Sequence, residues 1–380
     1  MTYDEVELAL LALPADASVL VAEQTASRID KDVDTIAAQH RIIRFNGRLM
    51  IEVYEPYPHF SLFTKVHYNR IAYPLLGAVK KSHINEIFWH LSRIAPDLNG
   101  NDHILLFGSL RSPRAHLTVW DMDALEVRSD IAPDDCVRRS PYPMKGSGNE
   151  PVSFIMQLAG NKQSLYDDIM QSLAPLVMAK KPDGVIWWVG GDNDGKTTLI
   201  EALRRIFPEQ LASLTIQQLN GRRRTLGLND KLGNIAADGE AQIKDAEIYK
   251  SIGTHRSFST HLYHSQNGIE VQGNVHHIFS ANSAPTFTTI DESILRRTQV
   301  VPFEQRFESY PVHAPTSEFC SRLIAEMCRY AVRIKQQGYL YSWSAATVAV
   351  KDKSYPGGKQ AAYEALNLNK PKPAPLEFRW

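Results

Sequence analysis

The stretch that decides the fold is Val189–Thr198, VGGDNDGKTT, which follows the apolar run GVIWW at residues 184–188. Its spacing, Gly-x-x-x-x-Gly-Lys-Thr, fits the pattern of a phosphate-binding loop at every position. The apolar run predicts a buried strand before the loop, and TLIEALRRIF at residues 198–207 predicts a helix after it. A glycine-rich turn in this setting surrounds a phosphate with backbone N–H groups and with the positive end of the helix dipole.

Two side chains of this loop carry the expected chemistry. Lys196 is expected to reach the β- and γ-phosphates of ATP, and Thr197 is expected to ligate Mg²⁺. A glycine-rich turn with a chance Lys-Thr pair is the alternative, but the flanking strand and helix favour nucleotide binding. The residues expected to contact the nucleotide are Gly190, Gly191, Asp192, Asn193, Asp194, Gly195, Lys196, Thr197 and Thr198.

Length, charge and cysteine content bound the class of protein. The chain has 380 residues, enough for two or three domains with hydrophobic cores. Its 42 basic and 42 acidic residues leave no net charge, so binding to nucleic acid would have to come from local clusters. Three cysteines and an acidic N-terminal segment predict a reducing, cytoplasmic setting. No apolar run approaches the roughly 20 residues that span a bilayer, so we expect a soluble protein with no membrane partner.

Three regions differ in their residue patterns. Residues 1–150 mix strand-like runs, including RIIRFNGRLMIEVY with its hairpin-forming NG, with an amphipathic helix around INEIFWHLSRIA. They predict an α+β accessory domain that collars the rest or binds DNA or a partner. Residues 151–312 alternate strand and helix patterns, which predicts an α/β fold with a parallel sheet flanked by helices. Residues 313–380 begin with a helix around SEFCSRLIAEMCRYAVRIKQQG and end in a Pro-rich tail, KPKPAPLEFRW.

Polar residues follow two further strand patterns in the second region. LGNIAADGE is a short apolar run that ends in Asp238 and Glu240, where one carboxylate could hold Mg²⁺ and the other could orient the attacking water. We take Thr197 and Asp238 as the expected metal ligands and leave open which acid is catalytic. An acidic turn on a solvated loop is the alternative. VHHIFSANSAP is a buried strand pattern that ends at Asn282, and ligands of open α/β sheets bind at such strand ends.

The order of motifs carries a resemblance. The phosphate-binding loop is followed by the acidic strand end, the hairpin pattern FSTHLYHSQNGIEVQ, the strand end FSAN and then DESILRRTQVVPF. This order, over roughly residues 90–305, resembles the superfamily 3 helicases of the AAA+ class, specifically the phage, plasmid and poxvirus primase-helicase branch. The resemblance implies an AAA+ P-loop core that hydrolyses ATP with Mg²⁺ and assembles into a homo-oligomeric, hexameric ring.

The resemblance also assigns roles to single residues. Asn282 would sense the γ-phosphate. Arg296 or Arg297 would reach into the ATP site of the neighbouring subunit, where a guanidinium neutralises charge in the transition state, and the spacing to Phe303 favours Arg297. The chain departs from the family pattern at FGS, which replaces the usual NG of the accessory segment, and at Gly239, which separates acids that are adjacent in many members.

The resemblance places DNA contacts in the hairpin region. In these helicases a loop between the acidic motif and the strand-end Asn enters the central channel and follows one DNA strand. Arg256 and His264 are the leading candidates here. One such contact from each subunit suffices, since the subunits stack their contacts along one strand and binding becomes salt-dependent. Ordinary surface residues of an edge strand are the alternative. The further candidates are Lys250, His255, His261 and Gln266.

Several other clusters have simpler interpretations. The basic run at residues 222–224 either contacts DNA or a neighbouring subunit or forms a solvated face. His276 and His277 point to opposite faces of a strand, and so do His261 and His264, which argues against a zinc site. The acids of DMDALE at residues 121–126 are interpreted as a solvated turn. Cys320 and Cys328 are expected in the core.

The resulting hypothesis is a ring-forming, ATP-dependent replicative DNA helicase of a phage, plasmid or other mobile element, moving 3′ to 5′ on single-stranded or forked duplex DNA in the cytoplasm of a bacterial host. We find no primase-type cluster of acids and histidines, so priming would come from a separate primase or polymerase. The alternative is a non-unwinding AAA+ ATPase that remodels or assembles a protein complex, and a monomeric P-loop kinase is a third candidate. The tail, which ends in Phe378 and Trp380, is either a docking peptide or a segment without a role.

Overall fold

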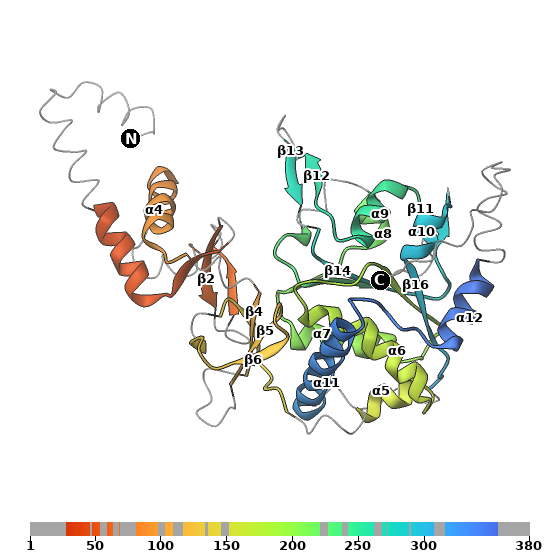
Figure 1. Ribbon diagram of the computed structural model, residues 1–380. Helices are drawn as coiled ribbons and strands as arrows, with labels where there is room; N and C mark the ends of the chain where they lie inside the picture. Colours follow the sequence, from red (N-terminus) through yellow and green to blue (C-terminus); the bar gives the residue numbers. More distant parts are fainter. Residues whose placement is uncertain are drawn as a thin grey trace, which may run out of the picture. The chain divides into compact units, whose positions relative to one another are not determined.

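The computed structural model (Figure 1) divides into two compact units, Met1–Asp102 and His103–Trp380. The domains expected from the sequence, residues 1–150, 151–312 and 313–380, stay predictions. The residues that the structure describes are 28–45, 48–53, 59–63, 68, 81–97, 103–108, 117–133, 136–145, 152–220, 227–237, 242–261, 268–271, 273–288, 290–307 and 316–355.

The first unit packs helices against a small antiparallel sheet with the strand order β1-β2-β3. Ile36, Ile51 and Ile87 form the centre of its core, each at most 1% exposed. The predicted antiparallel strands on either side of the NG are confirmed, although the NG itself lies outside the described residues. The elements are a helix at residues 28–39, β1 Ile42–Phe45, β2 Arg48–Val53, β3 His59–Leu62 and α4 Lys81–Ile94.

The second unit begins with a four-stranded sheet in the order β6-β5-β4-β7. The indole N–H of Trp120 donates to the carbonyl oxygen of Val177 at 2.9 Å, which ties this sheet to the helices of the same unit. Asp121 is only 3% exposed and accepts hydrogen bonds from the N–H groups of Asp123 and Ala124. The prediction of a solvated acidic turn is therefore wrong for Asp121, which stabilises the turn from inside. The strands are β4 Ile104–Phe107, β5 Thr118–Asp121, β6 Glu126–Arg128 and β7 Arg138–Ser140.

A five-stranded parallel sheet forms the centre of the second unit, in the order β16-β8-β14-β10-β9. Every neighbouring pair is parallel, so all five strands end at one edge. The strand that leads into the glycine-rich loop, β8, lies between β14 and β16. The predicted α/β fold with a parallel sheet is confirmed. The strands are β8 Val185–Gly190, β9 Leu211–Ala212, β10 Gly233–Ala237, β14 His276–Ala281 and β16 Thr298–Phe303.

Helices cover both faces of this sheet (Figure 1), and successive side chains of β8 point to opposite layers. Trp188 packs with α5, α6, α7 and α11, and its indole N–H donates to the Ser172 hydroxyl at 3.0 Å. Trp187 packs with α8, α9 and α10, and its indole N–H donates to the Tyr249 hydroxyl at 3.0 Å. Both buried indoles are thus hydrogen-bonded, as buried polar groups require. These helices are α5 Ser153–Leu158, α6 Gln163–Leu173, the 3₁₀ helix η3 Ala174–Val177, α7 Lys196–Ile206, α8 Ile216–Asn220, α9 Ala246–Gly253, α10 Glu292–Arg297 and α11 Ser317–Gln336.

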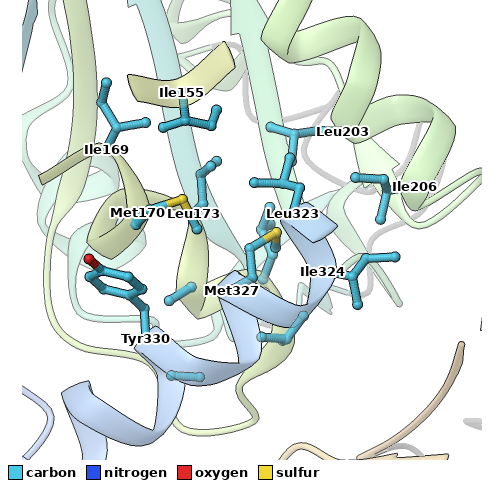
Figure 2. Packing of buried hydrophobic residues seen from close by; sticks show 14 of the residues in the cluster. Ile155, Ile169, Met170, Leu173, Leu203, Ile206, Leu323, Ile324, Met327 and Tyr330 are labelled. Atoms are coloured by element: carbon cyan, nitrogen blue, oxygen red, sulfur yellow. The ribbon is translucent and has the colours of Figure 1, made fainter. Parts of the chain in front are cut away.

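The predicted C-terminal helix is α11, and its apolar face packs in the layer of helices that contacts Trp188. Figure 2 shows Leu323 and Met327 of α11 in one cluster with Leu173 of α6 and Leu203 of α7. The helix begins with a capping hydrogen bond from the Phe319 N–H to the Thr316 hydroxyl, 3.1 Å. The predicted burial of the two cysteines on this helix is confirmed.

A further helix, α12 Ala345–Ser354, was not predicted from the sequence. Asp168 of α6 anchors it by accepting hydrogen bonds from the Ser344 N–H at 2.9 Å and from the Thr347 hydroxyl at 2.6 Å. AATVAVKDKS lacks the apolar period of an amphipathic helix, so only these contacts reveal it. The tail KPKPAPLEFRW lies outside the described residues.

The predicted hairpin is confirmed, because β12 Phe258–His261 and β13 Gly268–Val271 pair in antiparallel register. Gly273 allows its base to close, since a Cβ there would overlap the backbone of Arg256. A short parallel pair joins β11 Gln242–Ile243 to β15 Thr286–Phe287.

Candidate functional site

The glycine-rich loop closes tightly between β8 and α7, as predicted. Gly195, the residue before α7, has a φ of +83°, in the left-handed region that favours glycine. A Cβ on Gly195 would overlap Leu158 and approach Phe307 to 3.2 Å, and a Cβ on Gly190 would overlap the carbonyl oxygen of Phe303. The two glycines of the phosphate-binding pattern are therefore required by close packing of the loop.

Lys196 folds back across this loop. Its ammonium group donates to the carbonyl oxygens of Gly190 and Gly191, each at 3.0 Å, and forms a salt bridge with the Asp194 carboxylate. The backbone N–H of Lys196 donates to Asp194 Oδ1 at 3.2 Å. The Lys196 and Asp194 side chains are only 7% and 6% exposed. The loop thus brings an ammonium group and the first amide of α7 into one small volume, which is the donor set that suits a phosphate.

The other loop residues are placed nearer to solvent. Asp192, Asn193 and Thr197 are exposed and Thr198 is half-buried. The carbonyl oxygen of Asn193 accepts a hydrogen bond from the Phe307 N–H at 2.9 Å, which fixes the middle of the loop. Thr197 lies in the first turn of α7, where its hydroxyl could reach a metal ion beside the loop.

Asn282 lies at the end of the strand next to the one that leads into the loop. It directly follows β14, whose last residue Ala281 is opposite Val189 of β8. The strand on the other side of β14, β10, ends at the same edge, with Ala237 opposite Ser280. Asn282 is exposed at this edge. The acids that follow β10, Asp238 and Glu240, lie outside the described residues and stay predictions.

Arg296 and Arg297 lie at the opposite edge of the sheet. They precede β16, whose first residue Thr298 is opposite Val185 at the start of β8. Since parallel strands rise about 3.3 Å per residue, the length of β8 separates these arginines from the loop of the same chain by roughly 17 Å. Arg296 is exposed and Arg297 is half-buried. Neither side chain can reach the loop that follows its own β8.

The Arg297 side chain is also engaged within its own unit. Its guanidinium donates to the carbonyl oxygen of Ser293 at 2.8 Å, and its stem lies against Gly253 of α9. Burial, followed by the charge of Arg296, lowers its pKa from the ordinary value. Its Nε has no hydrogen-bond partner within the part of the chain that the structure describes.

The DNA-contact candidates separate into three groups. Lys250 forms salt bridges with Asp291 at 2.9 Å and Glu247 at 3.1 Å. The ring nitrogens of His255 lie 3.1 Å and 2.9 Å from the carbonyl oxygens of Val275 and Pro182, so this ring joins two segments of the unit. Arg256 is exposed at the base of the hairpin. His264, Gln266 and the run 222–224 lie outside the described residues, as does the side chain of His261.

Sequence reasoning missed a buried group of titratable side chains around the start of β14. His276 lies 2.7 Å from the Ser172 carbonyl oxygen and His277 stacks on Phe279, so the two rings do face opposite layers, as predicted. Burial lowers the pKa of His276, and it lowers that of His277 to about 3. Burial likewise lowers the pKa of Lys181, whose ammonium donates to the Pro175 carbonyl oxygen, to about 7. The apolar neighbours in VHHIF were the available sign that these histidines are internal.

No group of three or more potential metal ligands, among His, Cys, Asp and Glu, was found within the described residues. Over the same residues, no helix is long and apolar enough to cross a bilayer.

Comparison with known proteins shows likeness in structure alone. No protein-family model matches the chain, and no curated protein matches it. The chain is similar to an A-form apo structure of the NrS-1 C-terminal region, with a TM-score of 0.49 and 15% identity, covering 85% of this chain and 74% of that one. A second apo structure of that region gives a TM-score of 0.48 and 16% identity, with the same coverage. At this level of similarity, function has to be inferred from the residues themselves.

Proposed function

We propose that the protein is an ATP-dependent DNA helicase of the superfamily 3 type within the AAA+ class, serving DNA replication of a phage, plasmid or other mobile element. The observation that carries the proposal is the edge of the parallel sheet where the Lys196 loop and Asn282 follow the adjacent strands β8 and β14. β10 ends at the same edge, and Asp238 and Glu240 follow it in the sequence. This arrangement suits the binding and hydrolysis of a nucleoside triphosphate.

The residues of the loop fit a Mg²⁺–nucleotide. Lys196 and the N–H groups at the start of α7 would hold the phosphates, and a Cβ at Gly190 or Gly195 would fill the space that the loop needs. Thr197 and Asp238 would hold Mg²⁺, which when bound offsets negative charge on the phosphoryl group. Asn282 would contact the terminal phosphate, and Asp238 or Glu240 would orient the attacking water.

The position of the arginines supports action between subunits. Because about 17 Å separates them from their own loop, either arginine can assist hydrolysis only in a neighbouring copy. We assign this role to Arg296, since it is exposed, whereas Arg297, which its spacing to Phe303 favours, is turned toward Ser293. The assignment requires a closed homo-oligomer, for which we propose a hexameric ring.

Arg256 is the candidate DNA contact that the described structure supports best. It is exposed at the base of the hairpin, and the hairpin extends away from the parallel sheet (Figure 1). One cation per subunit, repeated around a ring, would follow the phosphates of a single strand. Lys250 and His255 are engaged in intramolecular contacts, so we propose structural roles for both.

The test is ATP hydrolysis with and without single-stranded DNA, for the wild type, Lys196→Ala, Arg256→Ala and Lys353→Ala. Lys353 is an exposed cation of α12 and serves as the charge control. We expect Lys196→Ala to abolish hydrolysis and Arg256→Ala to remove DNA stimulation while basal hydrolysis survives. Unchanged turnover of Lys196→Ala would refute the ATPase proposal.

A non-unwinding ATPase that remodels a protein complex is the second candidate. The intramolecular engagement of Lys250 and His255 favours it, because two of the expected DNA contacts are used inside the unit. In that case DNA would change the hydrolysis rate of neither the wild type nor Arg256→Ala.

A further inference from the structure

The carboxylate of Asp194 uses the donors that the loop would offer to a phosphate. Its Oδ1 accepts a hydrogen bond from the backbone N–H of Lys196, the first residue of α7, at 3.2 Å. Its Oδ2 contacts the Lys196 ammonium group. The helix N-terminal amide and the lysine ammonium are the two kinds of group by which such loops hold an anion. A side chain of the loop itself therefore serves as the anion.

The shape of the loop accommodates this carboxylate. A Cβ on Gly190 would overlap Asp194 Oδ2, so the carboxylate lies in space that only glycine at this position leaves open. Asp194 is 5% exposed. Asp192 has the same charge and lies two residues earlier in the same loop, but it is exposed. The two acids of the loop are thus chemically alike and differ in where they are held.

From this geometry we propose that Asp194 is an internal competitor of the nucleotide phosphates. When no nucleotide is bound, its carboxylate holds the Lys196 ammonium and the first amide of α7. A phosphate can reach these donors only after the carboxylate has moved away, because two anions repel each other at such short range. The inference rests on the proposed nucleotide-binding function and adds a residue that lowers the affinity for phosphate groups.

Binding of magnesium-free inorganic pyrophosphate and ADP tests the proposal without any need for hydrolysis. Isothermal titration in EDTA would compare the wild type with Asp194→Asn, which keeps the size and loses the charge, and with Asp352→Asn, at an exposed acid of α12, as the charge control. A hydrogen bond to a charged group is worth a factor of roughly 10 to 100, so Asp194→Asn should bind pyrophosphate about 10-fold more tightly or better. Asp352→Asn should stay within about 3-fold of the wild type, because an exposed charge is screened.

The outcomes separate this inference from the proposed function. If the wild type binds pyrophosphate and Asp194→Asn binds it no more tightly, the competitor role is wrong and nucleotide binding stands. Equal gains for the two Asn variants would also overturn it, because a general charge effect would then explain both. Failure of every protein to bind pyrophosphate, ADP or ATP with Mg²⁺ would overturn both proposals. Asp194→Ser provides a second uncharged variant if Asp194→Asn does not fold, and the same gain in affinity is expected of it.

Discussion

Replacing Arg296 and Arg297 separately by alanine should change the free energy of unfolding by unequal amounts, although the two residues are adjacent. Arg297 loses a hydrogen bond to the Ser293 carbonyl oxygen and the packing of its stem on Gly253. A hydrogen bond from a charged group is worth about 1.5–3 kcal/mol when buried. Because Arg297 is only half-buried, we expect Arg297→Ala to lower the free energy of unfolding by about 1–2 kcal/mol. Arg296 is exposed, so Arg296→Ala should stay within about 0.5 kcal/mol of the wild type.

The effects on ATP turnover should be the reverse. An arginine supplied between subunits contributes roughly 10³–10⁵ in turnover, equivalent to about 4–7 kcal/mol of the activation barrier. Arg296→Ala should therefore lower hydrolysis at least about 100-fold without weakening ATP binding, whereas folded Arg297→Ala should keep more than about a tenth of the activity. Steady-state phosphate release and urea denaturation of both variants measure the two effects, and mixing Arg296→Ala with Lys196→Ala should restore part of the activity. Hydrolysis by Arg296→Ala at the wild-type rate would refute the assignment, as would a large loss in Arg297→Ala that has normal stability.

Three further predictions concern the loop, the buried histidines and the contact between α9 and α10. Gly195→Ala should weaken ADP binding at least about 10-fold, because an alanine in the left-handed region costs about 1–2 kcal/mol and its Cβ would also overlap Leu158. Gly191→Ala should bind ADP normally, because there is open space around Gly191. Equal losses of affinity in titrations of the two variants would contradict the packing argument. Burial lowers the pKa values of His276 and His277 from an ordinary 6.5, so as the pH falls the unfolded chain takes up protons before the folded chain does. The free energy of unfolding should therefore fall as the pH drops below about 6.5, by up to about 1.4 kcal/mol per pH unit for each ring. Urea denaturation from pH 7.5 to 5 measures this fall, and His277→Gln should reduce the slope by about one proton; an unchanged slope would show that His277 does not contribute. Lys250→Ala removes the salt bridge to Asp291 and should reduce DNA stimulation of ATP hydrolysis more than it reduces basal hydrolysis. Glu247→Ala leaves that salt bridge in place and should not have this effect. The same loss of DNA stimulation in both variants would rule out a specific role for the Lys250–Asp291 salt bridge.

The elements of the site could be predicted from sequence because their patterns are local. GVIWW, VHHIFSA and TQVVPF are short segments that each contain an apolar run, and each contributes a strand of the parallel sheet. Glycine spacing and the amphipathic pattern after it predicted the loop and α7. The hairpin followed from alternation on both sides of a turn signal. Each of these signals lies within about twenty residues of chain, so no distant contact is needed to interpret it.

The contacts of the site's side chains could not be predicted, because they depend on distant segments. Lys250 has the sequence features of an exposed cation, yet Asp291, 41 residues later, is its partner. His255 has the features of a surface histidine, yet it lies between the carbonyl oxygens of Pro182 and Val275. The pairing of Asp194 with Lys196 is local in sequence, but it depends on Gly190 leaving room for the carboxylate. Residue type and spacing carry no signal for any of these arrangements.

The two edges of the parallel sheet make α9 the helix through which we expect ATP and DNA binding to be coupled. Under the proposed function, one edge holds the nucleotide and the other presents Arg296 to a neighbour's nucleotide. Movement of α10, which carries Arg296, would displace α9 through the Lys250–Asp291 salt bridge and through the packing of Gly253 on the Arg297 stem. The chain that leaves α9 runs directly into the base of the hairpin, where the Arg256 N–H donates to the Ser251 carbonyl oxygen at 3.1 Å. Lys250, Ser251 and Gly253 all lie in the last turn of α9, so under the proposed function a displacement of α10 would act directly on the segment that positions Arg256, without any rearrangement of the sheet.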